Sequence, residues 1–193
     1  FITPLFILIF FNALNLYDGV NLQSISYLII FFLFFYFKNI EITAYFYFFI
    51  FIVFFSYTNF KNKIFLGDSG VAIIAITLSY ITITNYNSQG NLSCEEIFLI
   101  MFLPGLDMLR VYFLRLFSGK NPFEPDKNHL HHYLLKKFSQ KYIFLFQVFF
   151  YLSIFYLVYF IKFNLLYVLI LMFFIYFFVI FSLNAKKILS KHI

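Results

Sequence analysis

The chain has 193 residues, of which 63% are hydrophobic and only 11% are charged, and its mean hydropathy is +0.89. Because a soluble domain carries about 25% charged residues, this composition excludes an ordinary soluble fold. The net charge is +6, but the sequence contains no basic soluble domain, so nucleic-acid binding is excluded as well. The positive charge is instead suited to bind anionic lipid headgroups or phosphorylated substrates.

Apolar segments follow one another along the chain, several of them near the ~20 residues that cross a hydrocarbon core of ~30 Å. The segments that we identify are 1–11, 24–37, 41–56, 69–84, 95–113, 142–161 and 165–183. The shorter ones can be sheltered by neighbouring helices of a bundle. The sequence therefore predicts an all-α, polytopic membrane helix bundle with about seven spans, which forms one integral membrane domain over 1–193.

The basic residues divide unequally between the two ends of this bundle. If the spans alternate in direction, twelve of the fourteen Lys and Arg residues fall at one end, and only Lys38 and Lys162 fall at the other. The positive-inside rule assigns the basic end, and with it the C-terminus, to the cytoplasm. All four aspartates and three of the four histidines lie on or near the same end. The expected cytoplasmic loops 12–23, 57–68 and 114–141 should therefore form a polar site.

The first polar block is NALNLYDGVN, residues 12–21. Asn12, Asn15 and Asp18 are three residues apart, so on a helix they share one broad face. Gly19 can end that helix or allow a close backbone approach. Amide and carboxylate oxygens suit magnesium or a nucleotide. An ordinary polar helix end is the alternative, and the block alone does not decide between the two.

The second block is FLGDSG, residues 65–70. Asp68, between Gly67 and Gly70, is suited to cap a helix N-terminus. The same position lets its carboxylate hold a cation while nearby backbone N–H groups meet phosphate.

The third block runs from residue 104 to residue 132 and ends in DKNHLHH. We expect Asp107 and Arg110, one helical turn apart, to form an ion pair. The three imidazoles of His129, His131 and His132 fit a zinc site. The carboxylate and amide groups elsewhere in the sequence instead favour magnesium with phosphates, which would leave these imidazoles to bind a diphosphate or a sugar. A cysteine zinc site is excluded, because Cys94 is the only cysteine.

In this order, the three blocks resemble the polyprenyl-phosphate N-acetylhexosamine-1-phosphate transferases of bacteria. The wider superfamily includes the phospho-MurNAc-pentapeptide transferase and the eukaryotic dolichyl-phosphate enzyme. The resemblance covers most of residues 10–135, and its most specific parts are DMLRV (107–111), GKNPF (119–123) and DKNHLHH (126–132). The last of these looks like the N-acetylglucosamine-1-phosphate branch rather than the peptidoglycan branch.

The resemblance implies a reaction at the bacterial inner membrane that starts the synthesis of a cell-envelope glycan. A polyprenyl phosphate would attack the β-phosphorus of a UDP-N-acetylhexosamine, release UMP and keep the sugar diphosphate on the lipid. Mg²⁺, with Mn²⁺ as the alternative, would neutralise the diphosphate and the leaving group.

The resemblance also implies roles for individual residues of this chain. Asn15 and Asp68 would be metal ligands, and Asp18 and Asp68 would be the catalytic carboxylates. The residues expected to contact the substrate are Asn12, Asn21, Arg110, His129, His131 and His132. Of these, Asn21 would lie near uracil, the histidines near the diphosphate-sugar, and Arg110 near a phosphate, with Arg115 as a weaker candidate.

The chain departs from the family pattern in three places. Many bacterial members carry Asp where Asn21 stands, and Gly-Leu-Ala where this chain has LQS at 22–24. The family also places an Asp-Asp pair upstream of the first block, and no Asp-Asp occurs here. We therefore expect the chain to be the C-terminal part of a longer transferase and to be inactive alone. The alternatives are a non-catalytic remnant and a membrane transporter, which would place ionisable residues at mid-membrane.

Overall fold

The computed structural model describes residues 2–19, 22–40, 46–61, 63–64, 66–87, 90–121 and 128–189. Within these ranges the chain is helical and has no β-strand. The helices are α1 (Ile2–Tyr17), α2 (Gln23–Phe37), α3 (Phe46–Phe60), α4 (Gly67–Asn87), α5 (Cys94–Phe117), α6 (Leu130–Leu135), α7 (Gln140–Phe155), the π-helical turn η2 (Tyr156–Phe160) and α8 (Leu165–Leu189). The prediction of an all-α bundle is confirmed.

Four helices of the described chain are long and apolar enough to cross a membrane. They are α4, α5, α7 with η2 as Gln140–Phe160, and the stretch Leu165–Leu183 of α8. Three further apolar helices, Thr3–Tyr17, Gln23–Phe37 and Ile50–Phe60, are shorter. The expected number of seven spans is therefore not confirmed, although a multi-pass helical membrane protein is.

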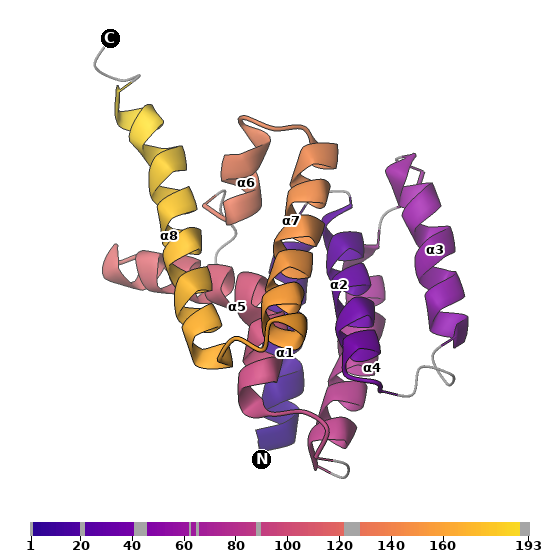
Figure 1. Cartoon of the computed structure of the whole chain (residues 1–193). Helices are drawn as coiled ribbons and strands as arrows, with labels where there is room; N and C mark the ends of the chain where they lie inside the picture. Colours follow the sequence, from indigo (N-terminus) through magenta and orange to yellow (C-terminus); the bar gives the residue numbers. More distant parts are fainter. Residues whose placement is uncertain are drawn as a thin grey trace.

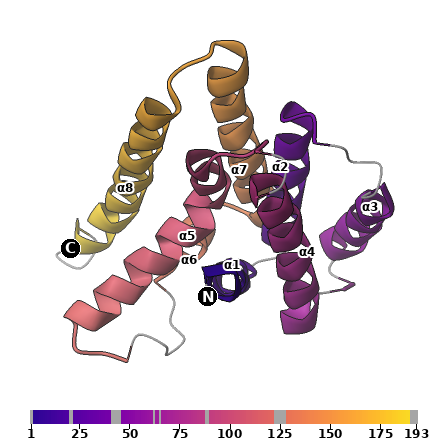
Figure 2. The same cartoon turned by 90° about the horizontal axis from the view of Figure 1, so that it is seen from below.

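The bundle is held together by aromatic side chains in its centre. The closest helix pairs are α1 with α4 and α2 with α7 (Figures 1 and 2). The ring of Phe31 is fully buried and packs edge-on against Tyr27 at 5.0 Å and Phe10 at 5.6 Å, a geometry that aromatic quadrupoles favour. By contrast, Phe178 and Phe181 of α8 are more than 70% exposed, as lipid-facing side chains are. Phenylalanine thus serves both the core and the outer surface.

Most of the polar segments lie at one end of the bundle. In Figure 1, α1, α3 and α8 end at the upper end, α2, α4 and α7 begin there, and α6 lies beside them. The observed loops at this end are shorter than the predicted loops 12–23, 57–68 and 114–141. Helices continue through residues 12–17, 57–60 and 114–117, and α6 forms within the third loop. Polar side chains at a helix end do not stop the helix, since intrinsic propensity is a weak determinant. In α3, for example, the Thr58 hydroxyl donates to the carbonyl of Phe55 and the helix continues.

Helix α5 changes direction within its length. Pro104 lies inside the helix, where its ring removes a backbone donor and bends the axis. Figure 1 shows the second half of α5 running sideways out of the bundle. This half carries Asp107 and Arg110 and contacts α8. The bend therefore determines where the charged part of the third block lies.

Candidate functional site

Asp18 lies directly after the C-terminal end of α1. Its backbone N–H donates to the carbonyl of Leu14 at 2.9 Å, and its half-buried carboxylate accepts a hydrogen bond from the Ser24 hydroxyl in the first turn of α2. Burial raises the pKa of Asp18 to about 6; the Ser24 hydrogen bond opposes this shift, and the carboxylate of Asp68 adds to it. The surroundings of Asp18 therefore disfavour the negative charge of its carboxylate.

Asp68 lies in the first turn of α4, where the helix dipole favours a negative charge. It follows Gly67, whose φ of +64° is in the left-handed region, and it is exposed. Because α1 packs along α4, Asp68 comes within electrostatic reach of Asp18. The first and second blocks of the sequence therefore meet in space.

The turn before α2 is tied to the end of α3 by Asn59, a residue that the sequence did not single out. The backbone N–H of Leu22 donates to Oδ1 of Asn59 at 2.9 Å, and Nδ2 of Asn59 donates to the carbonyl of Ile64 at 2.9 Å. Leu22 itself has a φ of 72°. One buried amide thus fixes the chain segments that lead to α2 and α4. A polar residue at the end of the apolar run 41–56 is the signal that could have indicated it.

The third block is organised around the buried carboxylate of Asp107. Its Oδ1 accepts hydrogen bonds from Nη2 of Arg110 at 2.8 Å and from the Tyr176 hydroxyl at 2.7 Å. Its Oδ2 lies 2.9 Å from Nδ1 of His129, and the backbone N–H of Leu130 donates to both oxygens. We call Asp107, Arg110, Tyr176 and His129 the carboxylate network. The ion pair predicted between Asp107 and Arg110 is confirmed, whereas Tyr176, 69 residues away from Asp107, gave no signal in the sequence.

The guanidinium of Arg110 is occupied by the protein. Besides Asp107, it donates from Nε to the Tyr176 oxygen at 2.7 Å and from Nη2 to the carbonyl of Asn128 at 2.5 Å. Arg110 is buried, and its contacts join α5, α8 and the residues that precede α6. A phosphate contact by Arg110 stays a prediction, and this geometry gives the residue a structural role.

The three histidines form a stacked group at the start of α6. The rings of His129 and His131 are parallel with centroids 5.7 Å apart, and the ring of His132 lies 4.1 Å from that of His131. The pKa of His131 is lowered to about 4, mainly by burial and also by the neighbouring imidazoles of His132 and His129, while Asp107 opposes the shift. Both ring nitrogens of His131 and Nε2 of His129 are buried without a hydrogen-bond partner in the described part of the chain. Buried nitrogens of this kind favour a polar ligand.

His131 also touches the first block. A Cβ added to Gly19 would lie 2.7 Å from Cε1 of His131, closer than side chains approach one another. A side chain at this position would require the His131 ring to move, which agrees with the close-approach alternative for Gly19. Asp68, Asp18, Gly19 and His131 therefore form a continuous path across α4, α1 and α6.

The other predicted site residues occupy less central positions. Asn15 is half-buried on α1, one turn before Asp18, and Asn12 is exposed one turn earlier. His132 is half-buried beside His131, and Asn21 lies outside the described residues. The structure thus brings together Asp18, Asp68 and the histidine group.

Asp18 and Asp68 are the carboxylates of this region that could contribute to a metal site. Among the described residues, no three His, Cys, Asp or Glu side chains form a group that could hold a metal ion. Magnesium is commonly bound by one or two carboxylates together with waters and substrate phosphates, and Asp18 with Asp68 supplies two carboxylates.

Comparison with known proteins identifies relatives for part of the chain. It is 32% identical over 77 residues to the undecaprenyl-phosphate alpha-N-acetylglucosaminyl 1-phosphate transferase of Pasteurella multocida, 31% over 77 residues to that of Haemophilus influenzae and 32% over 75 residues to that of Escherichia coli K12. The matches cover 38–39% of this chain and 20–22% of those proteins. The chain thus aligns with about a fifth of the length of the curated relatives it matches. No family model and no solved structure matches it.

Proposed function

We propose that this chain, a relative of the undecaprenyl-phosphate alpha-N-acetylglucosaminyl 1-phosphate transferases, carries part of the active site of a membrane sugar-1-phosphate transferase. The donor is a UDP-N-acetylhexosamine, most simply UDP-N-acetylglucosamine, and the acceptor is a polyprenyl phosphate. The product is the lipid-linked sugar diphosphate that starts a cell-envelope glycan. The site lies at the cytoplasmic end of the helices, where the basic residues gather.

The observation that supports this proposal is the meeting of the three blocks, in which Gly19 contacts His131 and Asp18 lies near Asp68. It joins three segments that are far apart in the sequence and that resemble the family's three motifs. A carboxylate pair next to unpartnered imidazole nitrogens is suited to a magnesium-bound diphosphate, since the two groups can engage its metal and its oxygens separately.

Asp18 and Asp68 would hold the magnesium ion, with the amide of Asn15 one turn away on the same helix. A magnesium ion bound there would neutralise the negative charge of the donor's diphosphate. The pKa of Asp18, raised mainly by burial and further by Asp68, is consistent with this role, because a bound cation would stabilise the buried carboxylate and relieve its repulsion with Asp68.

The histidine group binds and orients the donor. The carboxylate network holds Nδ1 of His129 and the first backbone N–H of α6, and so fixes the start of the helix that carries His131 and His132. The neutral ring of His131 offers nitrogens to the diphosphate-sugar from the side of α6 that faces Gly19. Positioning of this kind is the main contribution that a protein makes to phosphoryl transfer.

The chemical step exchanges one phosphorus–oxygen bond for another. An oxygen of the polyprenyl phosphate forms a bond to the β-phosphorus of the donor, while the bond from this phosphorus to the oxygen bridging to the α-phosphate breaks. That oxygen leaves on UMP with the electron pair. No redox partner and no covalent enzyme intermediate are required.

The proposal is tested by nucleotide exchange in membranes of cells that express the gene encoding this chain. We expect radiolabelled UMP to enter UDP-N-acetylglucosamine when polyprenyl phosphate and magnesium are present. Asp68→Asn should reduce the rate about 100-fold, the size of effect that follows loss of one electrostatic contact to a reacting phosphate. Lys162→Gln, at the opposite end of the bundle, is the matched control and should leave the rate unchanged. Exchange that is insensitive to Asp68→Asn would contradict the proposal.

A further inference from the structure

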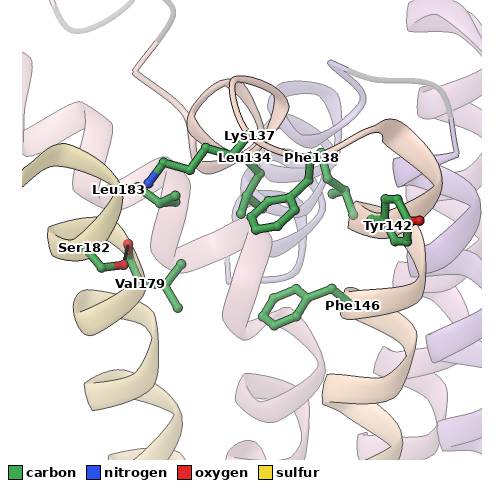
Figure 3. A pocket seen from close by; sticks show the side chains of 9 residues that line it. Leu134, Lys137, Phe138, Tyr142, Phe146, Val179, Ser182 and Leu183 are labelled. Carbon is green, nitrogen blue, oxygen red and sulfur yellow. Dashed lines mark hydrogen bonds between the residues drawn. The ribbon is translucent and has the colours of Figure 1, made fainter. Parts of the chain in front are cut away.

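A cavity lies apart from the candidate site, between α6, α7 and α8 (Figure 3). Its volume is about 580 Å³, within the range of small-ligand pockets. The residues that line it are Leu134, Lys137, Phe138, Tyr142, Ile143, Phe146, Val179, Ser182 and Leu183. None of them is an Asp or His of the candidate site, so its occupant need not be a reactant.

The lining is apolar apart from its rim. Leu134 and Ile143 are buried, while Phe138 and Phe146 are about half exposed. Ser182 donates its hydroxyl to the carbonyl of Val179 within α8 at 2.9 Å, so this donor is already used. Lys137 is the one charged residue of the lining. The cavity therefore matches a molecule with a hydrocarbon body and an anionic group at one end.

The cavity lies where a lipid headgroup meets the hydrocarbon. Lys137 precedes by three residues the candidate span Gln140–Phe160, and Ser182 is among the last residues of the candidate span Leu165–Leu183. Phe146 is six residues inside its span, about 9 Å along the helix. The ammonium thus stands at headgroup level, with the apolar chamber directly beneath it.

The charge of this part of the molecule is entirely positive. After Asp126 the sequence contains no acidic residue, but it contains Lys127, Lys136, Lys137, Lys141, Lys162, Lys186, Lys187 and Lys191. The ammonium groups of Lys136 and Lys141 each lie 5.0 Å from an aromatic ring centre. In the part of the chain that the structure describes, the backbone N–H of Lys137 donates to the carbonyl of Leu134, whereas its side-chain ammonium has neither a hydrogen bond nor an acidic partner. Basic residues at a membrane border attract anionic lipids, and Lys137 is available to do so.

We propose that this cavity binds an anionic glycerophospholipid, with its phosphate against Lys137 and one acyl chain along Leu134, Phe138 and Phe146. The proposal does not depend on the transferase activity. Its consequence concerns α6, because this short helix presents Leu134 to the cavity and His131 to Gly19. A bound lipid therefore stabilises the helix that holds the histidine group.

The absence of tryptophan from the sequence gives a direct test. A Phe146→Trp variant places a single fluorophore in the cavity, and Phe149→Trp, exposed on the same helix and outside the lining, is its matched control. Both are reconstituted in phosphatidylcholine vesicles with a small fraction of brominated phosphatidylglycerol or brominated phosphatidylcholine. We expect phosphatidylglycerol to quench Phe146→Trp more than phosphatidylcholine does, and the two lipids to quench Phe149→Trp equally.

Lys137→Gln in the Phe146→Trp background should lower the preference for the anionic lipid about fivefold, the factor expected for one lysine near a membrane surface. Lys162→Gln, at the far end of the bundle, should leave it unchanged. Equal quenching of Phe146→Trp by the two lipids, or a preference that survives Lys137→Gln, would overturn the proposal. Release of quenching by polyprenyl phosphate at a lower mole fraction than phosphatidylglycerol would also overturn it, because the cavity would then belong to the acceptor. If Phe146→Trp does not fold by circular dichroism, Leu183→Trp on the opposite wall takes its place.

Discussion

The Nδ1 atom of His129 lies 2.9 Å from Oδ2 of Asp107, and both side chains are buried. With Nδ1 held by this carboxylate, Nε2 is the nitrogen of His129 that is left for a ligand, and it has no other partner among the described residues. An orienting carboxylate on the far nitrogen is a common way to fix a functional imidazole. Asp107 thus holds His129 in position and need not touch the substrate.

Asp107→Asn should strongly destabilise the protein. The substitution leaves the guanidinium of Arg110 buried without a counter-charge, which costs about 3–5 kcal/mol of unfolding free energy. Tyr176→Phe removes one hydroxyl from the same network and should cost about 1–3 kcal/mol. Denaturant unfolding in detergent micelles, followed by circular dichroism, measures both values. An Asp107→Asn variant as stable as Tyr176→Phe would show that the carboxylate network does not hold the bundle together.

Gly19→Ala should displace His131. The added methyl group would collide with the imidazole ring, and a shift of about 1 Å in a positioning group can reduce a rate about 100-fold. We expect this loss in the nucleotide-exchange rate. Gly105→Ala is the matched control, because a Cβ there meets nothing within 4 Å and alanine favours a helix. Equal rates for the two variants would show that the contact between Gly19 and His131 has no role in the reaction.

The pH dependence of stability should separate Asp18 from His131. The pKa of His131 is lowered from 6.5 to about 4, so between these values only the unfolded state binds its proton, and acidification destabilises the fold. The pKa of Asp18 is raised from 3.8 to about 6, so acidification over nearly the same range stabilises the fold. The two contributions oppose each other in the unmodified chain.

Each single variant should expose the other contribution. Between pH 6 and pH 4, the unfolding free energy of Asp18→Asn should fall on acidification and that of His131→Asn should rise, each by at most about 1.4 kcal/mol per pH unit. Unfolding curves at half-unit pH steps provide the measurement. Identical pH slopes for the two variants would contradict the assignment of both groups.

Magnesium binding should depend on the protonation of Asp18. Because a cation must displace the proton, the apparent affinity for Mg²⁺ should be constant above pH 6 and fall about tenfold per pH unit below it. Asp68→Asn should weaken binding at every pH, since it removes one of the two carboxylates. Isothermal titration calorimetry of the purified protein at pH 5, 6 and 7 measures this dependence. An affinity that is equal at pH 5 and pH 7 would exclude Asp18 as a ligand.

The sequence predicted the helices and the gathering of polar segments at one end of the bundle, because both depend on local patterns. Apolar runs determine the helices, and alternation of direction brings Asp18, Asp68 and His131 to the same end. The ion pair between Asp107 and Arg110 was predictable for the same reason, since its partners are one helical turn apart.

Contacts between distant segments could not be predicted in this way. The hydrogen bond between Tyr176 and Asp107 depends on how α8 packs against α5, and the sequence contains 16 Tyr residues that do not differ locally. Asn59 acts through the backbone of Leu22, which adopts a left-handed conformation that its side chain does not indicate. Helix ends were also misplaced, since polar residues such as Asn12 are accommodated within α1.

The central claim is that the three sequence blocks meet in one site, and cysteine cross-linking between residues 19 and 131 tests it most directly. In a Cys94→Ser background, which removes the one native thiol, Gly19→Cys is combined with His131→Cys, or with Lys162→Cys as the distant control. After treatment with a short bis-maleimide, peptide mass spectrometry should find the cross-linked peptide for the first pair and none for the second. Failure of the first pair to cross-link, while both single cysteines react with maleimide, would show that the first and third blocks do not share a site.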